Sequence, residues 1–262
     1  MNLKLNYNTQ NKLARFIERK RLKQLKKHVN GGTIFIKGKP FIYHNGHAFF
    51  DTYNELFVRG IYEFNCTSTQ PYIIDCGANM GLSVLYFATK YPNALIEAFE
   101  PEAPIFNILQ QNTKALNLTN VKLHQKAVWH TQTTLKFFTD NGMGGSVTNN
   151  YSNQEPTLVN TVILANYLNQ KVAMLKIDIE GAEYQLLLHN TEGLKNVENL
   201  FVEYHSYINQ EQHLEGLLQI IKNAGFRYHI TESFCQNKPF IDINLACENM
   251  DMAINIFAYR NK

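Results

Sequence analysis

The 262-residue chain has few cysteines, and this excludes several classes of small protein. The 4 cysteines are Cys66, Cys76, Cys235 and Cys247. They form no C-x-x-C pair, so the paired ligand spacing of a zinc site is absent. A chain of this length with 45% hydrophobic residues can bury a sizeable core, and it does not need a disulfide scaffold. A reducing cytoplasm is therefore the expected compartment.

Long apolar runs are also absent. Each run ends at a polar or charged residue well before the roughly 20 residues that a transmembrane helix needs. The N-terminus is too basic for a secretory signal. With only 7 prolines and 18% charged residues, the composition is that of a folded domain and not of a disordered one. We expect a folded cytoplasmic protein without a membrane span.

Positive charge is concentrated at the N-terminus. Residues 1–30 contain nine Lys or Arg and a single acid, Glu18, whereas the remainder has 16 basic and 21 acidic residues. On a helix of about 100° per residue, the apolar side chains of residues 10–29 lie on one side and nearly all basic ones on the other. One interpretation is peripheral contact with an anionic membrane or a polyanionic carrier. The other is docking of the apolar side on the chain's own domain or on a second copy in a homo-oligomer.

The rest of the chain divides into an N-terminal extension, residues 31–70, and a larger domain, residues 71–262. The extension has two short strands around a Gly-Lys-Pro turn (33–44) and a helical segment (53–64). In the larger domain strand-like and helix-like segments alternate, which implies crossover connections and a mostly parallel sheet with helices on both faces. We expect strands at 72–75, 94–100, 120–129, 133–139, 171–179, 199–205, 226–230 and 252–260. We expect helices at 80–91, 103–118 and 211–225, another after residue 179, and one with an extended lead-in at 157–169.

The first central strand leads into a glycine-containing break, D-C-G-A-N-M-G, which begins at Asp75. Gly77 is free to adopt a positive φ and to let a ligand approach the backbone, and Gly81 lets the following helix pack closely against the strand. The helix N-terminus also offers N–H groups to a ligand. In parallel sheets ligands bind beyond the carboxyl ends of the strands, so this loop is a candidate binding site.

An acid at the end of the next strand indicates what the loop binds. Glu100 follows Asp75 by 25 residues, where a carboxylate accepts hydrogen bonds from the two hydroxyls of a ribose. The dinucleotide fingerprint requires glycine at the position of Asn79, and a G-K-[ST] phosphate loop is absent. An NAD-dependent oxidoreductase is therefore disfavoured. S-adenosylmethionine, which carries no phosphate, fits the D-x-G-A-N-x-G loop better.

Four segments resemble, in order, the FkbM-type S-adenosylmethionine-dependent methyltransferases. They are "IIDCGANMGLSVLYFA", "AFEPEAPIFNILQQNTKALNLTNV", "LKIDIEGAEYQLL" and "FVEYH", and the resemblance covers roughly residues 50–230. It implies a Rossmann-like class I methyltransferase fold, with a seven-stranded, mostly parallel sheet and a reversed last hairpin. It also implies O-methylation, frequently of sugars or other small-molecule hydroxyls.

The resemblance also implies which residues bind the cofactor. The residues matching the methionine-binding loop are Asp75, Gly77, Ala78, Asn79 and Gly81, with Ser83 nearby. Glu100 matches the ribose-binding acid. The adenine is expected near residues 125–128, where no motif identifies a residue. The chain departs from the family at Ala165 and Asn166, where relatives often carry an acidic pair.

Candidate catalytic residues stand at two further strand ends. Lys176, Asp178 and Glu180 alternate onto one side of a strand and its exit, and Glu203 and His205 share one face of the next strand. Glu183 follows in the first turn of a helix, where an acid is favourable without any catalytic role. Two neighbouring strands would thus deliver Asp178, Glu203 and His205 to one crevice.

The sequence leaves the chemical role of these groups open. His205 is a natural base near neutral pH and would take the proton of an acceptor hydroxyl. Alternatively, Asp178, Glu203 and His205 would hold a divalent cation that polarises the hydroxyl. Lys176 would act in catalysis or would only neutralise nearby carboxylates.

We therefore expect a methyltransferase acting on a hydroxyl of a saccharide or another small molecule, in a process such as polysaccharide biosynthesis. Nucleic acid is not the expected acceptor, because the Asn- or Asp-Pro-Pro-aromatic stretch of amino-group methyltransferases is absent where "DIEG" stands. A second glycine-rich stretch, residues 140–147, is either a tight turn or a loop over the acceptor. The alternative function is a catalytically inactive cofactor-binding scaffold or a membrane-tethered partner.

Overall fold

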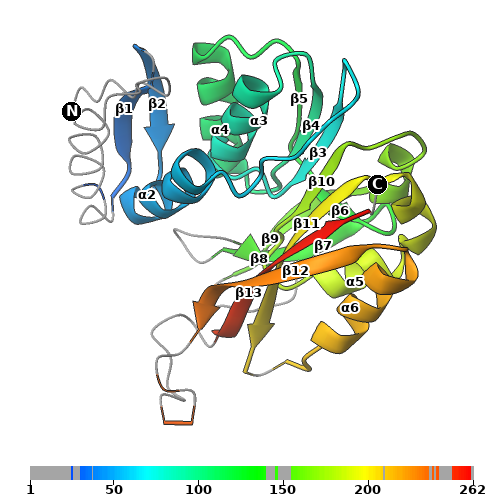
Figure 1. Cartoon of the computed structure of the whole chain (residues 1–262). Coiled ribbons are helices and arrows are strands. Elements are labelled where there is room, and N and C mark those ends of the chain that lie inside the picture. The colour runs from blue at the N-terminus through cyan, green and yellow to red at the C-terminus, as the bar shows by residue number, and fades with distance from the viewer. Residues whose placement is uncertain are drawn as a thin grey trace.

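A computed structural model of the chain describes residues 25, 30–36, 38–139, 145–146, 155–208, 210–235, 238, 240–241 and 250–260. Its centre is a seven-stranded sheet in the order β12-β13-β11-β10-β3-β4-β5 (Figure 1). The strands are β3 (Tyr72–Cys76), β4 (Leu95–Phe99), β5 (Val121–His124), β10 (Met174–Ile177), β11 (Asn199–Tyr207), β12 (Arg227–Cys235) and β13 (Met250–Tyr259). All neighbouring pairs are parallel except those that β13 makes with β11 and β12. The predicted mostly parallel sheet is confirmed, and in the predicted last hairpin, β12–β13, the reversed strand is β13.

Helices cover both faces of the sheet because its strands are apolar on both sides. In β3, Ile73 packs into a core formed with α3 and the N-terminal elements, whereas its neighbour Ile74 packs into a second core formed with α5 and α6. Side chains that alternate along a strand point to opposite faces, so a continuous apolar run serves both layers. The covering helices are α3 (Leu82–Lys90), α4 (Ala103–Ala115), α5 (Glu183–Leu188) and α6 (Leu214–Asn223), and the short η3 (Thr191–Asn196) precedes β11.

A second sheet corrects two of the sequence predictions. It has the order β6-β9-β7-β8 and comprises β6 (Ala127–Trp129), β7 (Thr134–Thr139), β8 (Gly145–Ser146) and β9 (Thr157–Ile163). The extended lead-in predicted at the start of 157–169 is the strand β9, but the helix predicted to follow it is wrong, since only the short η2 (Leu164–Tyr167) is helical. Val159 and Thr161 are buried whereas Leu158 and Asn160 are exposed, which is the period-two pattern of a strand. The single strand predicted at 120–129 is two strands, β5 and β6, in different sheets.

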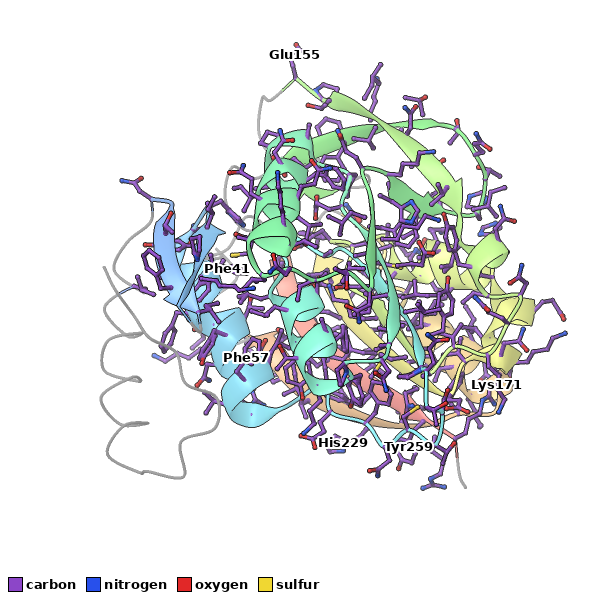
Figure 2. The ribbon with its side chains drawn as sticks, turned by 90° about the horizontal axis from the view of Figure 1, so that it is seen from above. Phe41, Phe57, Glu155, Lys171, His229 and Tyr259 are labelled. Carbon is purple, nitrogen blue, oxygen red and sulfur yellow. The ribbon has the colours of Figure 1, made fainter. Side chains whose placement is uncertain are left out.

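The N-terminal elements pack beside α3 and α4. The predicted hairpin is confirmed as β1 (Gly32–Ile36) and β2 (Lys39–Tyr43). The helical segment predicted at 53–64 starts earlier, as α2 (Gly46–Tyr53) and the π-helical η1 (Asn54–Arg59), because Asn45 caps it; it ends at Gly60, whose φ is 69°. Phe41 of β2 (labelled in Figure 2) is fully buried, and its ring centroid lies 5.8 Å from that of Phe49 in α2.

Some predictions concern parts of the chain that the structure does not describe. Apart from Leu25, Asn30 and the β8 pair, the predicted basic helix and the glycine-rich stretch 140–147 lie outside the described residues. Of the cysteines, Cys66 and Cys76 are free thiols. No described helix is both long enough and apolar enough to cross a membrane.

Gly77 lets two strand ends approach each other closely. It follows β3 with a φ of 85°, and a Cβ added there would lie 1.9 Å from the carbonyl oxygen of Asp178, the residue after β10. The sequence explained this glycine by room for a ligand. In the structure the backbone of Asp178 already occupies that space, so the glycine is required by the fold itself.

Replacing Gly77 by alanine should therefore cost far more stability than the same change at another positive-φ glycine. Gly38 has a φ of 80° and nothing within 4 Å of an added Cβ, so Gly38→Ala should lose only the left-handed penalty of about 1–2 kcal/mol. Gly77→Ala adds a backbone clash, and we expect a total loss on the order of 3 kcal/mol or more. Urea unfolding of both variants measures the difference, and equal losses would contradict the explanation.

Candidate functional site

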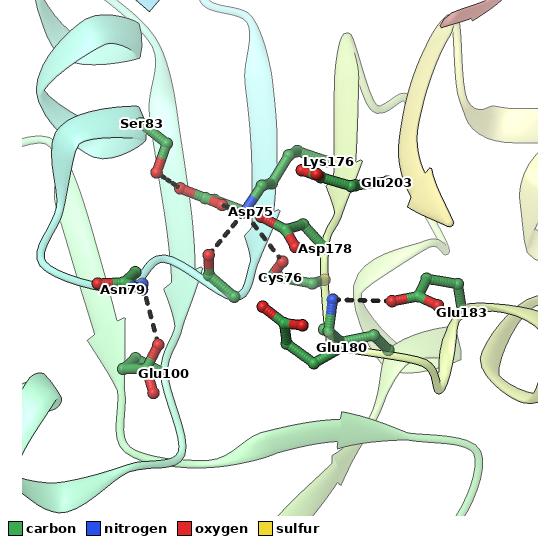
Figure 3. A network of polar contacts seen from close by, with 12 residues as sticks. Asp75, Cys76, Asn79, Ser83, Glu100, Lys176, Asp178, Glu180, Glu183 and Glu203 are labelled. Carbon is green, nitrogen blue, oxygen red and sulfur yellow. Dashed lines mark hydrogen bonds and ion pairs between the residues drawn. The ribbon is translucent and has the colours of Figure 1, made fainter. Parts of the chain in front are cut away.

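The predicted site residues lie where β3, β4, β10 and β11 end at their carboxyl termini. Figure 3 shows that the loop after β3 faces the acids that follow β10, with Lys176 between them. Register explains this meeting, because Lys176 in β10 is paired with Asp75 in β3 and the two strands are parallel. Residues far apart in the sequence are thus brought to one edge of the sheet.

The loop after β3 is held in an unusual backbone conformation. Asn79 has a φ of 47°, and its N–H donates to Glu100 Oε2 at 2.9 Å. The Asn79 side-chain oxygen accepts from Met80 N at 2.6 Å and lies 2.7 Å from His44 Nε2. Side-chain hydrogen bonds of this kind make the left-handed region accessible to asparagine.

Gly81 ends the loop at a φ of 94° and precedes α3. The sequence predicted that it lets the helix pack closely against the strand. The predicted packing partner, the strand, is wrong. A Cβ added at Gly81 would instead lie 2.7 Å from Leu109 Cδ1 in α4. The small residue therefore serves contact between the loop and α4.

Glu100 follows β4 and is buried. Its two oxygens accept N–H groups from Asn79 and, at 3.0 Å, from Glu102. Burial raises the pKa of Glu100 to about 7, although these two N–H donors act in the opposite direction. The group consequently titrates near neutral pH.

A buried ammonium group links the loop to the acids. Lys176 Nζ donates to the carbonyl of Gly77 at 2.6 Å and lies 3.4 Å from Asp75 Oδ1 and 3.1 Å from Asp178 Oδ2. Burial alone would lower the pKa of Lys176, but the carboxylates of Asp178 and Asp75 outweigh it and raise the pKa. Asp75 is fully buried and also accepts from Ser83 Oγ at 2.5 Å. Lys176, Asp75 and Ser83 thus hold one another in the interior.

Asp178, Glu203 and His205 come together as the sequence predicted. One possible ligand atom from each lies within 4.8 Å of the others, a spacing that would allow them to hold a metal ion. The Nε2 atom of His205 is 4.0 Å from Asp178 Oδ1, 4.0 Å from Glu203 Oε1 and 3.5 Å from Glu180 Oε2. Asp178 is the most exposed of the four side chains, at 26%. We call these four residues, Asp178, Glu180, Glu203 and His205, the acid cluster.

Glu180 stands in the turn between β10 and α5. It has a φ of 56°, in the left-handed region, and its Oε2 accepts from the Tyr207 hydroxyl at 3.2 Å. A long side chain is disfavoured in that conformation by about 1–2 kcal/mol. The turn therefore keeps a strained acid directed at His205.

Glu183 has a role that its place in the sequence did not reveal. Its side chain is fully buried, and Oε1 accepts from Gly181 N at 3.0 Å and lies 3.1 Å from His205 Nδ1. A carboxylate only accepts, so Nδ1 of His205 carries a proton and Nε2 faces the acid cluster. The sequence predicted only a favourable acid in a first helical turn, because its partner lies 22 residues away on another strand.

Two further pKa values are raised in the cluster, that of His205 by the surrounding carboxylates and that of Glu203 mainly by burial. Burial alone would lower the pKa of His205, but the carboxylates of Glu180 and Glu183 outweigh it and hold the pKa well above its usual value. Burial raises the pKa of Glu203 to about 8, helped by Asp178 and opposed by His205. Ser233 Oγ also donates to Glu203 Oε1, at 2.6 Å. Near neutral pH these groups hold protons that they would release in water.

Comparison with known proteins finds methyltransferases. A family model described as "Methyltransferase FkbM domain" matches residues 75–228. "Methyltransferase 1" of Beauveria bassiana is 27% identical over 177 residues, which cover 58% of this chain and 71% of that protein. "Methyltransferase sdnD" of Sordaria araneosa is 28% identical over 208 residues, 64% of this chain and 79% of that protein. A solved structure, "Methyltransferase FkbM from Methylobacillus flagellatus KT", aligns with a TM-score of 0.46 at 11% identity, covering 93% of this chain and 59% of that one.

Replacing Glu183 by glutamine should lower the pKa of His205, because it removes a charge 3.1 Å from Nδ1 without changing the side-chain volume. Titration of the His205 ring by NMR, assigned with a His205→Asn variant, measures this shift. Glu192→Gln removes an acid whose side chain is 95% exposed and should leave the titration unchanged. An unaltered His205 pKa in Glu183→Gln would contradict the assignment.

Proposed function

The chain belongs to the family of methyltransferases with an FkbM domain, whose model matches more than half of it, and on this premise we propose that it is an S-adenosylmethionine-dependent O-methyltransferase. The proposed acceptor is a hydroxyl group of a saccharide or of another small molecule. The observation that carries the proposal is the ammonium group of Lys176, which contacts both the Gly77 carbonyl of the loop and the Asp178 carboxylate of the acid cluster. It joins a candidate cofactor site to a candidate proton acceptor.

The residues at the loop fit S-adenosylmethionine. A carboxylate has about four acceptor positions. Glu100 uses one for each of two N–H groups, which leaves capacity for two ribose hydroxyls. The positive φ of Gly77 and Asn79 keeps a sharply turned backbone beside Glu100. Asn79 stands where a pyrophosphate would need glycine, which favours a cofactor without phosphates.

The protein's own contribution is to hold the acceptor oxygen and to take its proton. When bound, S-adenosylmethionine supplies an electrophilic methyl group and leaves as a neutral thioether. Positioning of the acceptor can contribute on the order of 7 to 11 kcal/mol. A base contributes about 10²- to 10⁴-fold in rate. As the acceptor oxygen forms its bond to carbon, its proton passes to the base.

Asp178 is the better candidate for this base than His205. The pKa of His205 is held well above its usual value, so the ring is charged at neutral pH and is a poor proton acceptor. Asp178 is the most exposed member of the acid cluster and follows β10 directly beside the loop. His205 would keep the three acids of the cluster close together by its positive charge.

A second mechanism uses a divalent cation at Asp178, Glu203 and His205. Two carboxylates and one imidazole suit such an ion. The contact of Glu183 with the other ring nitrogen of His205 is the usual arrangement around a metal-bound histidine. The ion would polarise the acceptor hydroxyl and lower its pKa.

The test of the proposal is transfer of labelled methyl from S-adenosylmethionine to candidate acceptors: sugar nucleotides, lipid-linked saccharides and free glycans. Labelling of RNA or of protein, and not of these acceptors, would contradict the proposed acceptor class. Calorimetry with S-adenosylmethionine and its demethylated product separates the enzyme from an inactive scaffold. Absence of heat with both ligands would contradict the proposed cofactor.

Replacing Asp178 by asparagine should lower methyl transfer by at least about 100-fold, with cofactor affinity nearly unchanged, because the variant keeps the shape but loses the base. Single-turnover rates at saturating cofactor measure the effect. Glu215→Gln, an exposed acid of α6, is the matched control and should keep full activity. Wild-type turnover in Asp178→Asn would rule out this base, and loss of activity with a chelator, restored by magnesium, would support the cation.

Cofactor affinity should rise with pH around the pKa of Glu100, which is about 7 in the free protein. Below that pH the carboxyl is protonated and is a poorer acceptor for two hydroxyls, so affinity should fall by at most about tenfold per pH unit. Calorimetry between about pH 5.5 and 8.5 measures this, and Glu100→Gln reports any pH dependence of the ligand itself. Identical profiles for the two proteins would contradict the role of Glu100.

A further inference from the structure

A residue of the N-terminal extension contacts the candidate cofactor loop directly. His44 follows β2, and its Nε2 lies 2.7 Å from the side-chain oxygen of Asn79. It precedes the region that matches the methyltransferase family, which begins at residue 75. The contact therefore joins the loop to a part of the chain that the family match does not include.

The direction of this hydrogen bond follows from its neighbours. Met80 N donates to the same Asn79 oxygen at 2.6 Å, which identifies that atom as an acceptor. Nε2 of His44 must then carry the hydrogen and donate it. Two donors thus hold one amide oxygen, and the Asn79 backbone N–H remains directed at Glu100.

His44 is held in position from both sides. The buried Asn112 side chain in α4 accepts from Ile42 N at 2.7 Å and donates to Ile42 O at 2.8 Å, which binds β2 as a neighbouring strand would. The same amide donates to Met80 O at 2.8 Å. On the other side, Asn45 caps α2 through the N–H groups of His47 and Ala48. The hairpin, α4 and the loop therefore share one set of polar contacts.

We propose that His44 is a positioning residue of the cofactor site, which holds Asn79 in its left-handed conformation so that the Asn79 N–H and the Glu100 carboxylate stay aligned. This inference rests on the proposed cofactor function of the loop. The hairpin β1–β2 is then a part of the binding site and not only a covering of the sheet. Because coupling between two sites is reciprocal, cofactor binding should in turn protect the hairpin.

The test compares His44→Ala with His44→Gln, whose side-chain amide N–H can replace the Nε2 donor. We expect His44→Ala to bind S-adenosylmethionine about 5- to 10-fold more weakly, as for one lost hydrogen bond that also orders a loop. Its kcat at saturating cofactor should change less than about twofold, and His44→Gln should restore most of the affinity. His47→Ala, which removes a half-exposed histidine of α2 that pairs with Asp51, is the matched control and should bind normally.

Hydrogen exchange of the ligand-free variants supplies a readout that does not depend on activity. The amides of Asn79 and Met80 should exchange faster in His44→Ala and at the wild-type rate in His44→Gln, whereas those of β10 should not change. Faster exchange throughout the sheet would contradict a local role, and so would wild-type exchange and affinity in His44→Ala. If the wild-type protein binds no S-adenosylmethionine, the proposed function fails while the exchange data still decide the role of His44.

Discussion

The site depends on one buried charge. The Lys176 ammonium is 3% exposed and lies among two backbone carbonyls, the fully buried carboxylate of Asp75 and the partly exposed carboxylate of Asp178. Burying an ammonium group costs several kcal/mol unless the interior supplies partners of opposite charge. Loss of the buried Asp75 carboxylate would leave the ammonium group incompletely compensated. This requirement holds the end of β3 against the end of β10. The loop after β3 and the acid cluster therefore keep a fixed position relative to each other.

The acid cluster differs from the surroundings of Lys176 in its balance of charge. Three acids surround His205 at its Nε2 side and Glu183 adds a fourth at Nδ1, so carboxylates outnumber the positive groups nearby. Glu203 and His205 therefore keep their protons to a higher pH than they would in water, as their raised pKa values indicate. A sulfonium cofactor or a divalent ion would each relieve this excess. The arrangement therefore suits a positively charged ligand, whichever mechanism operates.

The sequence predicted the strand-loop-helix unit and the strand-end acids because these depend on local pattern. Asp75, Glu100, Asp178 and His205 each lie near or just after the carboxyl end of an apolar strand, and parallel strands bring such ends together. Contacts between distant segments could not be predicted in this way. Glu183 resembled a favourable acid in a first helical turn, and His44 was one histidine among 9. The extent of the strand at 157–163 was underestimated because the apolar residues that follow it continue into η2 and obscure the period-two alternation.

The Asn112 amide has a consequence for how this domain can be divided. It pairs with Ile42 at the extension and with Met80 in the loop, and Asn112 is only 2% exposed. A fragment cut to residues 75–228 would strip β13 from β11 and leave this amide facing solvent instead of a strand. The matched region 75–228 therefore leaves out strands and polar contacts that complete the fold. Chimaeras of such enzymes should be joined outside the hairpin and the last strand, and not at the borders of sequence similarity.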